Sequence, residues 1–336
     1  MKIMVFDVPA ESGGALSVLN DFYKEYSTDE ENEYIFVVSK PELKDTKNIK
    51  VLRFPWIKKS WFHRLYFDNF IAHKLVKKYK VDEILSLQNI IVPRCKCRQT
   101  VYVHNALPFS EYRFSFRENK LLWIYQNVLS KKIFKSIIKA NKVIVQTEWM
   151  KKSCVEKLNI DSQKILVSPP KINVEVRKSK RSQIDKRSFI MFFYPASGVI
   201  FKNHKVILEA CLEMHRNNIR NYEFVLTLLG NENEEIKKIY EISKVNKLPI
   251  RFVGNLSRKE VFDYYTKSIL VFPSFIESSP LPLTEAKMHG ANIIVSNLPY
   301  AHEILSDYTH VEYFNPFEEK DLYIKLKEKC DNIFVK

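Results

Sequence analysis

The sequence predicts an α/β protein with two domains, each built on a parallel β-sheet. Short apolar runs of the length of a buried strand alternate with amphipathic segments that have helical spacing. Polar residues directly follow most of these runs, as they do where parallel strands end at a ligand-binding edge. A charged, weakly periodic segment at 173–187 separates two such series, and 336 residues suit two domains with a linker.

The first series covers 1–172 and predicts an N-terminal domain. Strands are expected at 2–8, 34–38, 49–54, 83–87, 100–103, 142–146 and 165–168. The chain opens as a strand, a Gly13-Gly14 turn and a helix over 15–26, an order that allows a ligand close to the backbone. It lacks the GxGxxG and P-loop patterns, so an ordinary tight turn is the alternative interpretation.

The second series covers 188–320 and predicts a C-terminal domain, followed by a segment at 321–336 that could pack back on the N-terminal domain. Strands are expected at 188–194, 223–230, 250–253, 268–272, 292–296 and 311–314. Helices are expected at 203–215, 232–245, 257–267 and 321–329. Ser257 and Glu260 have the spacing of a helix capping box.

The stretch 272–290, FPSFIESSPLPLTEAKMHG, reads as the end of a strand, a loop and a helix that begins near Leu283 and stops at Gly290. Glu277 lies in the loop, and we expect Glu285 in the first helical turn. Carboxylates here could accept hydrogen bonds from sugar hydroxyls, while the N–H groups of the helix start could face a phosphate. The alternative is that Glu285 only complements the helix dipole and Glu277 is solvated.

Composition limits the class of protein. No apolar run is long enough for a membrane-spanning helix, and the N-terminus resembles a core strand rather than a signal peptide. The five cysteines are scattered and are expected to be reduced thiols. Cys95 and Cys97 are close in sequence, but no second pair completes a zinc site, and we expect no metal.

Charge is distributed unevenly along the chain. The net charge is +15, of which +12 lies in residues 1–172, where 30 Lys and Arg oppose 18 Asp and Glu. A basic half of this kind attracts nucleic acid, anionic lipid or a phosphorylated substrate. Solvated lysine-rich helix faces are the alternative source of part of the excess.

Two segments, 55–80 and 114–142, interleave aromatic and aliphatic residues with lysines. Basic amphipathic helices of this composition can lie on anionic bilayers. They can equally pack on a sheet while their lysines extend to water. We favour packing as the main role of the apolar faces, with membrane attraction left to the lysines.

The stretch around Glu277 and Glu285 resembles the family 4 (group 1) glycosyltransferases of GT-B fold. Their pattern is Pro-Ser-x-x-Glu-Gly-x-Gly-Leu-x-x-x-Glu-Ala-x-x-x-Gly, and the similarity is greatest over 190–305. The matching residues in this chain are Ser274, Glu277, Leu281, Glu285, Ala286 and Gly290. Weaker resemblances to the family lie at Gly13-Gly14, His104-Asn105, Lys202-Asn203, Gly254, Asn297, Pro299 and Glu303.

The resemblance implies two Rossmann-like domains whose parallel sheets face each other across a cleft. It implies a metal-independent hexosyltransferase that retains anomeric configuration and uses a nucleotide-diphosphate sugar as substrate, without a cofactor. Lys202 would contact the diphosphate, and Glu285 the ribose. His104 and Glu277 would be catalytic, with both near the transferred sugar. The donor-binding residues would be Gly13, Gly14, Ser197, Lys202, Gly254, Asn255, Ser279, Pro280, Leu281 and Glu285, with the backbone of 279–281 capping the phosphates.

The chain departs from the family pattern at two places. Ser197 stands where the family usually has an Arg, five residues before the Lys, so Lys205 or another base would supply the second charge. Ser278, Ser279 and Pro280 replace the glycine-rich part of the loop, and this stiffer backbone could narrow the choice of donor.

Taken alone, several of these residues have ordinary interpretations. His104 could be a satisfied histidine at a strand end, and Lys202 could be a surface lysine.

The function expected from the resemblance is sugar transfer from a UDP- or GDP-linked donor to a glycan or lipid-linked glycan, in surface polysaccharide biosynthesis. The enzyme would be cytoplasmic and peripheral at the inner face of the cell membrane, held partly by anionic lipid. A nucleotide-sugar epimerase of the same fold is one alternative. A basic nucleic-acid-binding module is another, but no RRM, KH or zinc-finger signature is present, so we expect no nucleic acid.

Overall fold

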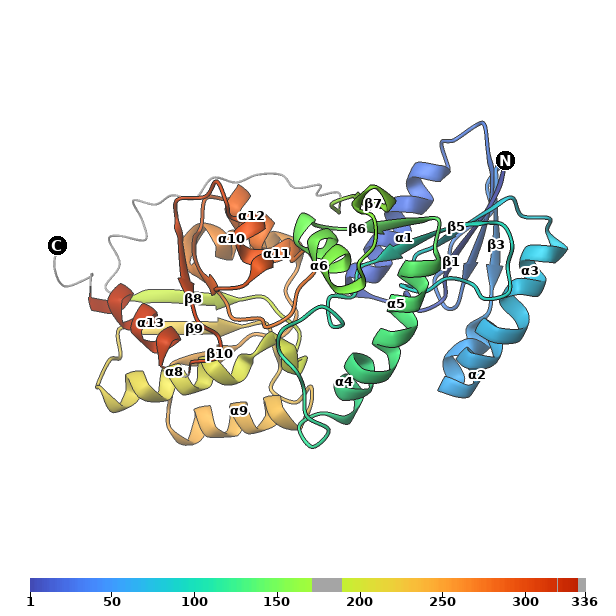
Figure 1. Ribbon diagram of the computed structural model, residues 1–336. Coiled ribbons are helices and arrows are strands. Elements are labelled where there is room, and N and C mark those ends of the chain that lie inside the picture. Colours follow the sequence, from blue (N-terminus) through green and yellow to red (C-terminus); the bar gives the residue numbers. More distant parts are fainter. Residues whose placement is uncertain (171–188, 319, 332–336) are drawn as a thin grey trace. The chain divides into compact units, whose positions relative to one another are not determined.

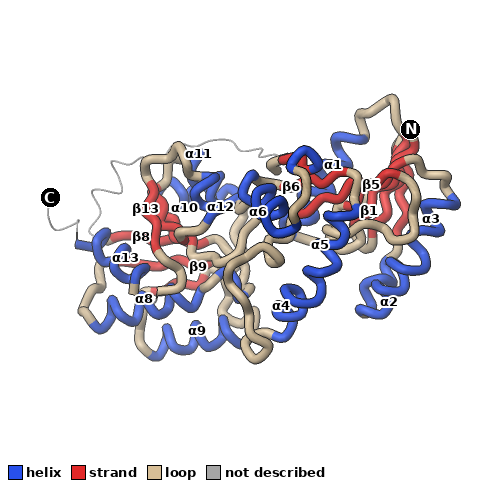
Figure 2. The backbone as a smooth tube through the Cα atoms, in the orientation of Figure 1, coloured by secondary structure: helices blue, strands red, loops and turns tan. Residues whose placement is uncertain are grey.

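The computed structural model describes residues 1–170, 189–318 and 320–331, and the chain divides into two compact units, Met1–Lys171 and Ile172–Lys336 (Figure 1). The predicted linker at 173–187 lies outside the described residues. Each unit is an α/β domain with one parallel sheet and helices against it, as the sequence predicts. Figure 2 shows this alternation of strand and helix in both units.

The sheet of the first unit has seven parallel strands in the order β3-β2-β1-β4-β5-β6-β7. The strands are β1 (Lys2–Asp7), β2 (Glu33–Val38), β3 (Ile49–Arg53), β4 (Glu83–Ser86), β5 (Arg98–Val103), β6 (Lys142–Val145) and β7 (Ile165–Val167). The register pairs Val5 with Phe36 on one side of β1 and with Leu85 on the other. Strand order reverses between β1 and β4, and in open α/β sheets such a switch point is where ligands bind.

Helices cover both faces of this sheet. They are α1 (Gly13–Tyr26), η1 (Pro55–Lys59), α2 (Trp61–Tyr66), η2 (Phe67–Ile71), α3 (Ala72–Lys78), α4 (Lys120–Ile124), η3 (Tyr125–Leu129), α5 (Ser130–Lys139), α6 (Glu148–Leu158) and η4 (Ser162–Lys164). Of these, η2 and η3 are single π-helical segments inside longer helices. The sequence pattern did not reveal α6, because only Met150 and Cys154 of this helix are buried and its other positions are mostly charged or polar.

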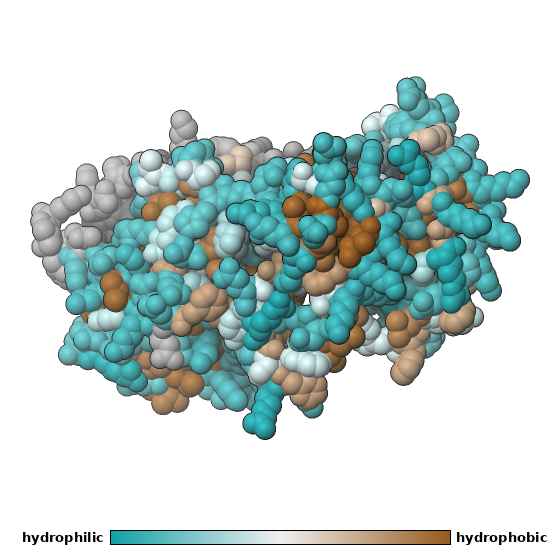
Figure 3. All heavy atoms as spheres, in the orientation of Figure 1, coloured by the Kyte–Doolittle hydropathy of each residue, from teal (hydrophilic) through white to brown (hydrophobic). Residues whose placement is uncertain are grey.

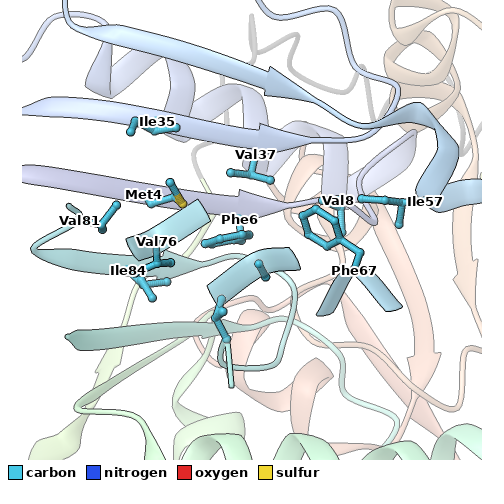
Figure 4. Packing of buried hydrophobic residues seen from close by; sticks show 12 residues of the cluster. Met4, Phe6, Val8, Ile35, Val37, Ile57, Phe67, Val76, Val81 and Ile84 are labelled. Carbon is cyan, nitrogen blue, oxygen red and sulfur yellow. The ribbon is translucent and has the colours of Figure 1, made fainter. Parts of the chain in front are cut away.

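Alternate residues of the central strands supply two separate cores. Figure 4 shows Met4, Phe6 and Val8 at β1 beside Ile35 and Val37 of β2, on the face that Phe67 and Ile57 also cover. The intervening residues, such as Val5 and Phe36, pack with α1 on the opposite face. Both faces of the strands are therefore buried, which explains their nearly continuous apolar sequence.

The aromatic segment at 55–80 is only partly a packing element. Phe67 is fully buried, but Trp61 is 52% exposed, Phe62 is 82% exposed and Tyr66 is 55% exposed. Our preference for packing is therefore wrong for these three side chains, which lie along α2 on the outside of the unit. The period of a helix identifies an apolar face but not whether another element covers it.

The second unit repeats the topology with six parallel strands in the order β10-β9-β8-β11-β12-β13. The strands are β8 (Ile190–Tyr194), β9 (Tyr222–Leu226), β10 (Ile250–Phe252), β11 (Ile269–Phe272), β12 (Asn292–Ser296) and β13 (Val311–Phe314). Phe192 pairs with Ile269 across the central β8–β11 contact. The order reverses at this contact, which places a second switch point beyond Tyr194 and Phe272.

The helical elements of this unit are η5 (Ile200–Lys202), α8 (His204–Arg216), α9 (Glu234–Val245), α10 (Arg258–Lys267), α11 (Leu281–Met288), α12 (Pro299–Ile304) and α13 (Asp321–Asp331). In Figures 1 and 2, α8 and α9 lie on one side of the sheet and α10 to α12 on the other. The predicted capping box is present at Ser257 and Glu260. The described part of the last helix, α13, packs on α8 and β13 of its own unit.

Among the described residues, no helix combines the length and apolar character needed to cross a bilayer. Figure 3 shows mostly hydrophilic side chains on the face in view, with separate hydrophobic groups between them.

Candidate functional site

The candidate donor site lies at the switch point of the second unit. The loop after β8 carries Lys202, and the loop after β11 carries Glu277, so residues 75 positions apart in sequence meet at one edge of the sheet. The Lys202 Nζ lies 2.5 Å from Glu277 Oε1. Their side chains are 19% and 11% exposed, so this ion pair is largely removed from water.

Hydrogen bonds to backbone carbonyls hold the two loops together. The Phe201 carbonyl accepts from the Phe275 N–H at 2.9 Å and from the Ser274 hydroxyl at 3.1 Å. The Asn203 side chain donates to the Pro273 carbonyl at 3.2 Å. Asn203 has a φ of 56° and ends the short helix η5 that presents Lys202. Asn adopts this left-handed conformation more readily than most residues, which gives a local reason for the Lys-Asn pair.

Two buried tyrosines fix the backbone of the two loops that carry the ion pair. Tyr194 donates its hydroxyl to the Lys202 carbonyl at 3.0 Å, and Tyr300 donates to the Ser274 carbonyl at 2.7 Å. Burial raises the pKa of both hydroxyls well above the usual value, and the negative charge of Glu277 raises it further. Both therefore stay protonated as donors and fix the backbone on either side of the pair.

Glu285 forms a second polar cluster in the same unit. Its Oε1 accepts from Arg258 Nη2 at 2.8 Å, and its Oε2 accepts from the Tyr265 hydroxyl at 3.4 Å. Burial raises the pKa of the Glu285 carboxyl, while Arg258 and Tyr265 oppose that effect. A buried carboxylate with cationic and hydroxyl partners is pre-oriented and retains acceptor capacity for a ligand hydroxyl.

The structure changes where Glu285 stands in its helix. The sequence predicts a start near Leu283, but α11 begins at Leu281, so Glu285 lies beyond the first turn. The prediction of a first-turn acid is therefore wrong, and dipole trimming at the helix start is not its role. Pro280 and Pro282 explain the earlier start, because proline is favoured at the beginning of a helix.

The other predicted donor residues of the second unit lie in its loops and at the start of α11. Ser279 and Leu281 are half-buried and Pro280 is buried at the start of α11, whereas Ser197 and Asn255 are exposed. Gly254 has a φ of 70°, and a Cβ there would lie 2.8 Å from Leu229 Cδ2. Both observations explain why this turn after β10 needs glycine.

His104 and the Gly13-Gly14 turn belong to the first unit. Gly13 has a φ of 59° and begins α1, with Gly14 beside it, and both residues are exposed. Asn89 holds His104 in place. Its Oδ1 accepts from the His104 backbone N–H at 2.9 Å, and its Nδ2 lies 3.4 Å from His104 Nε2.

Burial lowers the pKa of the His104 imidazole to about 4. The ring is therefore neutral at pH 7, so it can donate or accept a hydrogen bond but carries no charge. In the described part of the chain its Nδ1 is buried without a hydrogen-bond partner.

Sequence reasoning missed Arg258, Tyr265 and His204. Arg258 directly follows the capping residue Ser257, so the sequence already placed it at the start of a helix. Tyr265 approaches Glu285 only through the packing of α10 against α11. His204 starts α8 beside Lys202, and burial followed by the Lys202 charge lowers its pKa to about 3. The His204 imidazole is therefore neutral at pH 7 and adds no second positive charge beside Lys202.

Comparison with known proteins agrees with this arrangement. A model of the family described as "Glycosyl transferases group 1" matches residues 176–328, the span that carries both polar clusters. Residues 176–328 therefore form a group 1 glycosyltransferase domain. Both the resemblance and the sugar-transferase class predicted from the sequence are confirmed.

Relatives and solved structures extend the match to the whole chain. The O-antigen chain mannosyltransferase RfbU of Salmonella typhimurium is 23% identical over 264 residues, which are 78% of this chain and 69% of that protein. HepE of Anabaena, solved with UDP-glucose, has a TM-score of 0.68 at 14% identity, covering 99% of this chain and 90% of its own. WaaG, a glycosyltransferase involved in lipopolysaccharide biosynthesis, has a TM-score of 0.69 at 14% identity, with 98% and 90% covered. These likenesses show the fold, and the predicted GT-B class is confirmed.

Proposed function

We propose that this glycosyltransferase moves a sugar from a nucleotide-diphosphate donor to a glycan or lipid-linked glycan in surface polysaccharide biosynthesis. The observation that carries the proposal is the Lys202–Glu277 pair at the switch point, with the Glu285–Arg258 cluster in the same unit. The names of RfbU and WaaG support this class of pathway, and the HepE complex supports a UDP-linked donor.

In this proposal the two clusters divide the donor between them. Lys202 supplies positive charge where the diphosphate departs, and developing negative charge is best stabilised by groups already in place. Glu277 shares Lys202 and turns its free oxygen toward the sugar, where an oxocarbenium-like centre needs negative charge nearby. Glu285 accepts hydrogen bonds from the ribose hydroxyls. The backbone at 279–281 caps the phosphates, and Gly254 and Asn255 lie beside the base.

The reaction retains anomeric configuration and proceeds without metal in this proposal. His104 is neutral at pH 7, so it forms a hydrogen bond with the transferred sugar and contributes no positive charge. Gly13 and Gly14 let the first unit's backbone approach the same substrate. Ser197 leaves the position of the expected arginine without charge, and Lys205, which pairs with Glu209 at 3.1 Å in the first turn of α8, is the proposed substitute.

Nucleotide binding tests the donor assignment. UDP or GDP should raise the melting temperature of the wild-type protein, because a ligand that binds only the folded state stabilises it. Glu285→Ala should weaken that nucleotide by about tenfold to a hundredfold, which is the cost of a charge-assisted hydrogen bond. Glu241→Ala, at an exposed position of α9, is the matched control and should leave binding unchanged.

Two other outcomes would favour the alternatives. Stabilisation by a short oligonucleotide but by neither nucleotide would favour the nucleic-acid module. Conversion of a nucleotide sugar to its epimer with no acceptor present would favour the epimerase.

A further inference from the structure

A cavity in the first unit occupies the switch point of its own sheet. It has a volume of about 440 Å³ and is bordered by Pro9 after β1 and by Gln88 and Asn89 after β4. The position corresponds within this unit to that of the Lys202–Glu277 pair within the second unit. A volume of this size suits one or two sugar rings.

The lining of the cavity combines an aromatic wall with several cationic side chains. Trp61 and Tyr125 form the wall, with ring centroids 6.2 Å apart. Lys58, Arg64 and Lys132 are the lining cations, and Asp68 is the one carboxylate among the described residues that line it. Ser60, Gln88, Asn89 and Asn105 add neutral polar groups. Aromatic faces suit the apolar face of a sugar, and amide groups suit its hydroxyls.

Arg64 is held rigidly toward this space. Its Nε lies 3.0 Å from both oxygens of Asp68, which is 4% exposed, and its Nη2 donates to Gln88 Oε1 at 2.8 Å. Its Nη1 makes no hydrogen bond to any residue of 1–170, 189–318 or 320–331. A guanidinium fixed on one edge by buried partners offers the other edge to an anion with little loss of conformational entropy.

Lys132 adds a more loosely held charge. Its Nζ lies 3.5 Å from Asp68 Oδ2, at the limit of a hydrogen bond, and its side chain is 39% exposed. Asp68 therefore balances about one of the two cations beside it, and a net positive charge remains. Both π-helical segments contribute here, since η2 carries Asp68 while η3 carries Tyr125. Such segments often occur at functional sites.

One lining residue, Asn89, connects the cavity to the predicted catalytic histidine. Asn89 lines it and holds both the backbone and the ring of His104. A ligand that contacts the Asn89 side chain in the cavity would therefore touch a residue that also positions His104.

We propose that this cavity binds the acceptor through a sugar residue that bears a carboxylate or a phosphate, with Arg64 and Lys132 recognising the anion and Trp61 the ring. The assignment of this sugar as the acceptor rests on the proposed function. Charge-assisted hydrogen bonds to the anion then distinguish a charged acceptor sugar from its neutral counterpart.

Ligand-observed NMR titrations of the full chain without nucleotide test this proposal. The probes are glucose 6-phosphate, glucuronic acid, glucose and inorganic phosphate. At least one of the two charged sugars should bind about tenfold tighter than glucose, and the tighter one identifies the anion as phosphate or carboxylate. Lys132→Gln should weaken the preferred probe by about threefold to tenfold and leave glucose unchanged.

Lys131→Gln is the matched control, because Lys131 is an exposed neighbour on α5 that does not line the cavity. Equal affinities for glucose and both charged sugars would overturn the proposal, as would equal losses in the two lysine variants. Inorganic phosphate that binds as tightly as the preferred charged sugar would overturn the sugar part. None of these failures touches the nucleotide result with Glu285→Ala, so the donor and acceptor assignments fail separately.

Discussion

The two units share one topology but equip its switch point differently. In the second unit the switch point holds a compact acid–base pair, Lys202 and Glu277, mostly removed from water. In the first unit it holds an open cavity with an aromatic wall and excess positive charge. The same strand order therefore provides a position for binding, while the side chains that follow the strands decide what is bound.

The two units also differ in their net charge and in their exposed apolar side chains. Residues 1–172 carry +12 and the rest of the chain +3. The first unit also exposes an apolar strip on α2 and η2, formed by Trp61, Phe62, Leu65, Tyr66 and Phe70. Under the proposed function, these differences suit donor binding by the second unit and an anionic, partly apolar partner for the first.

The largest effect is expected at the acid–base pair. Glu277→Gln removes the negative charge from the sugar side of the pair but keeps its size, so sugar transfer should fall by about a hundredfold or more. Nucleotide affinity, measured by thermal stabilisation, should change little. Normal transfer by this variant would show that the second unit's switch point is not the reaction centre.

An intermediate effect is expected at the apolar strip. We predict that the protein binds vesicles containing anionic lipid, and that Phe62→Ser lowers this binding by roughly tenfold, as loss of about 1.4 kcal/mol of apolar burial would. Val245→Ser is the control in the other unit, because Val245 is 81% exposed and Phe62 is 82% exposed.

Added salt should also weaken vesicle flotation, since the lysines beside the strip contribute through screened electrostatics. Flotation that does not weaken with salt, or that falls equally in Phe62→Ser and Val245→Ser, would contradict the proposed difference between the surfaces of the two units.

A separate effect, on stability rather than on sugar transfer or membrane binding, is expected at Asp7, at the carboxyl end of β1. Its side chain is 1% exposed, and burial raises its pKa to about 8, although the Ala10 backbone, Arg64 and Lys58 oppose this. The Ala10 N–H approaches the carboxyl without full hydrogen-bond geometry, and within the described residues neither oxygen has a partner. The folded state therefore holds a proton that the unfolded state releases near pH 4.

Stability from this group is present below pH 4 and is lost as pH rises toward 8, by about 1.4 kcal/mol per pH unit. Asp7→Asn should remove that loss, so its melting temperature should exceed the wild-type value most at pH 8 and least at pH 4. Asp21→Asn, at a half-buried position of α1, is the control for the substitution itself. A constant difference between Asp7→Asn and wild type across this range would contradict the proposed ionisation.

The sequence by itself determined the α/β class, most strands, and the residues of the Glu277–Glu285 stretch. These features are local, because strand length, capping and the motif each depend on a few neighbouring residues. It also singled out Lys202, although only through the resemblance.

Only the tertiary structure decided which of these residues meet. The Lys202–Glu277 contact depends on β8 and β11 being neighbours, and sequence periodicity does not specify strand order. Glu285 gained Arg258 and Tyr265 as partners through the packing of α10 on α11. The exposed side chains of α2 and the cavity beside Arg64 likewise depend on which helix faces remain uncovered. Coverage is a property of the assembled fold, whereas a helical pattern records only that one face is apolar.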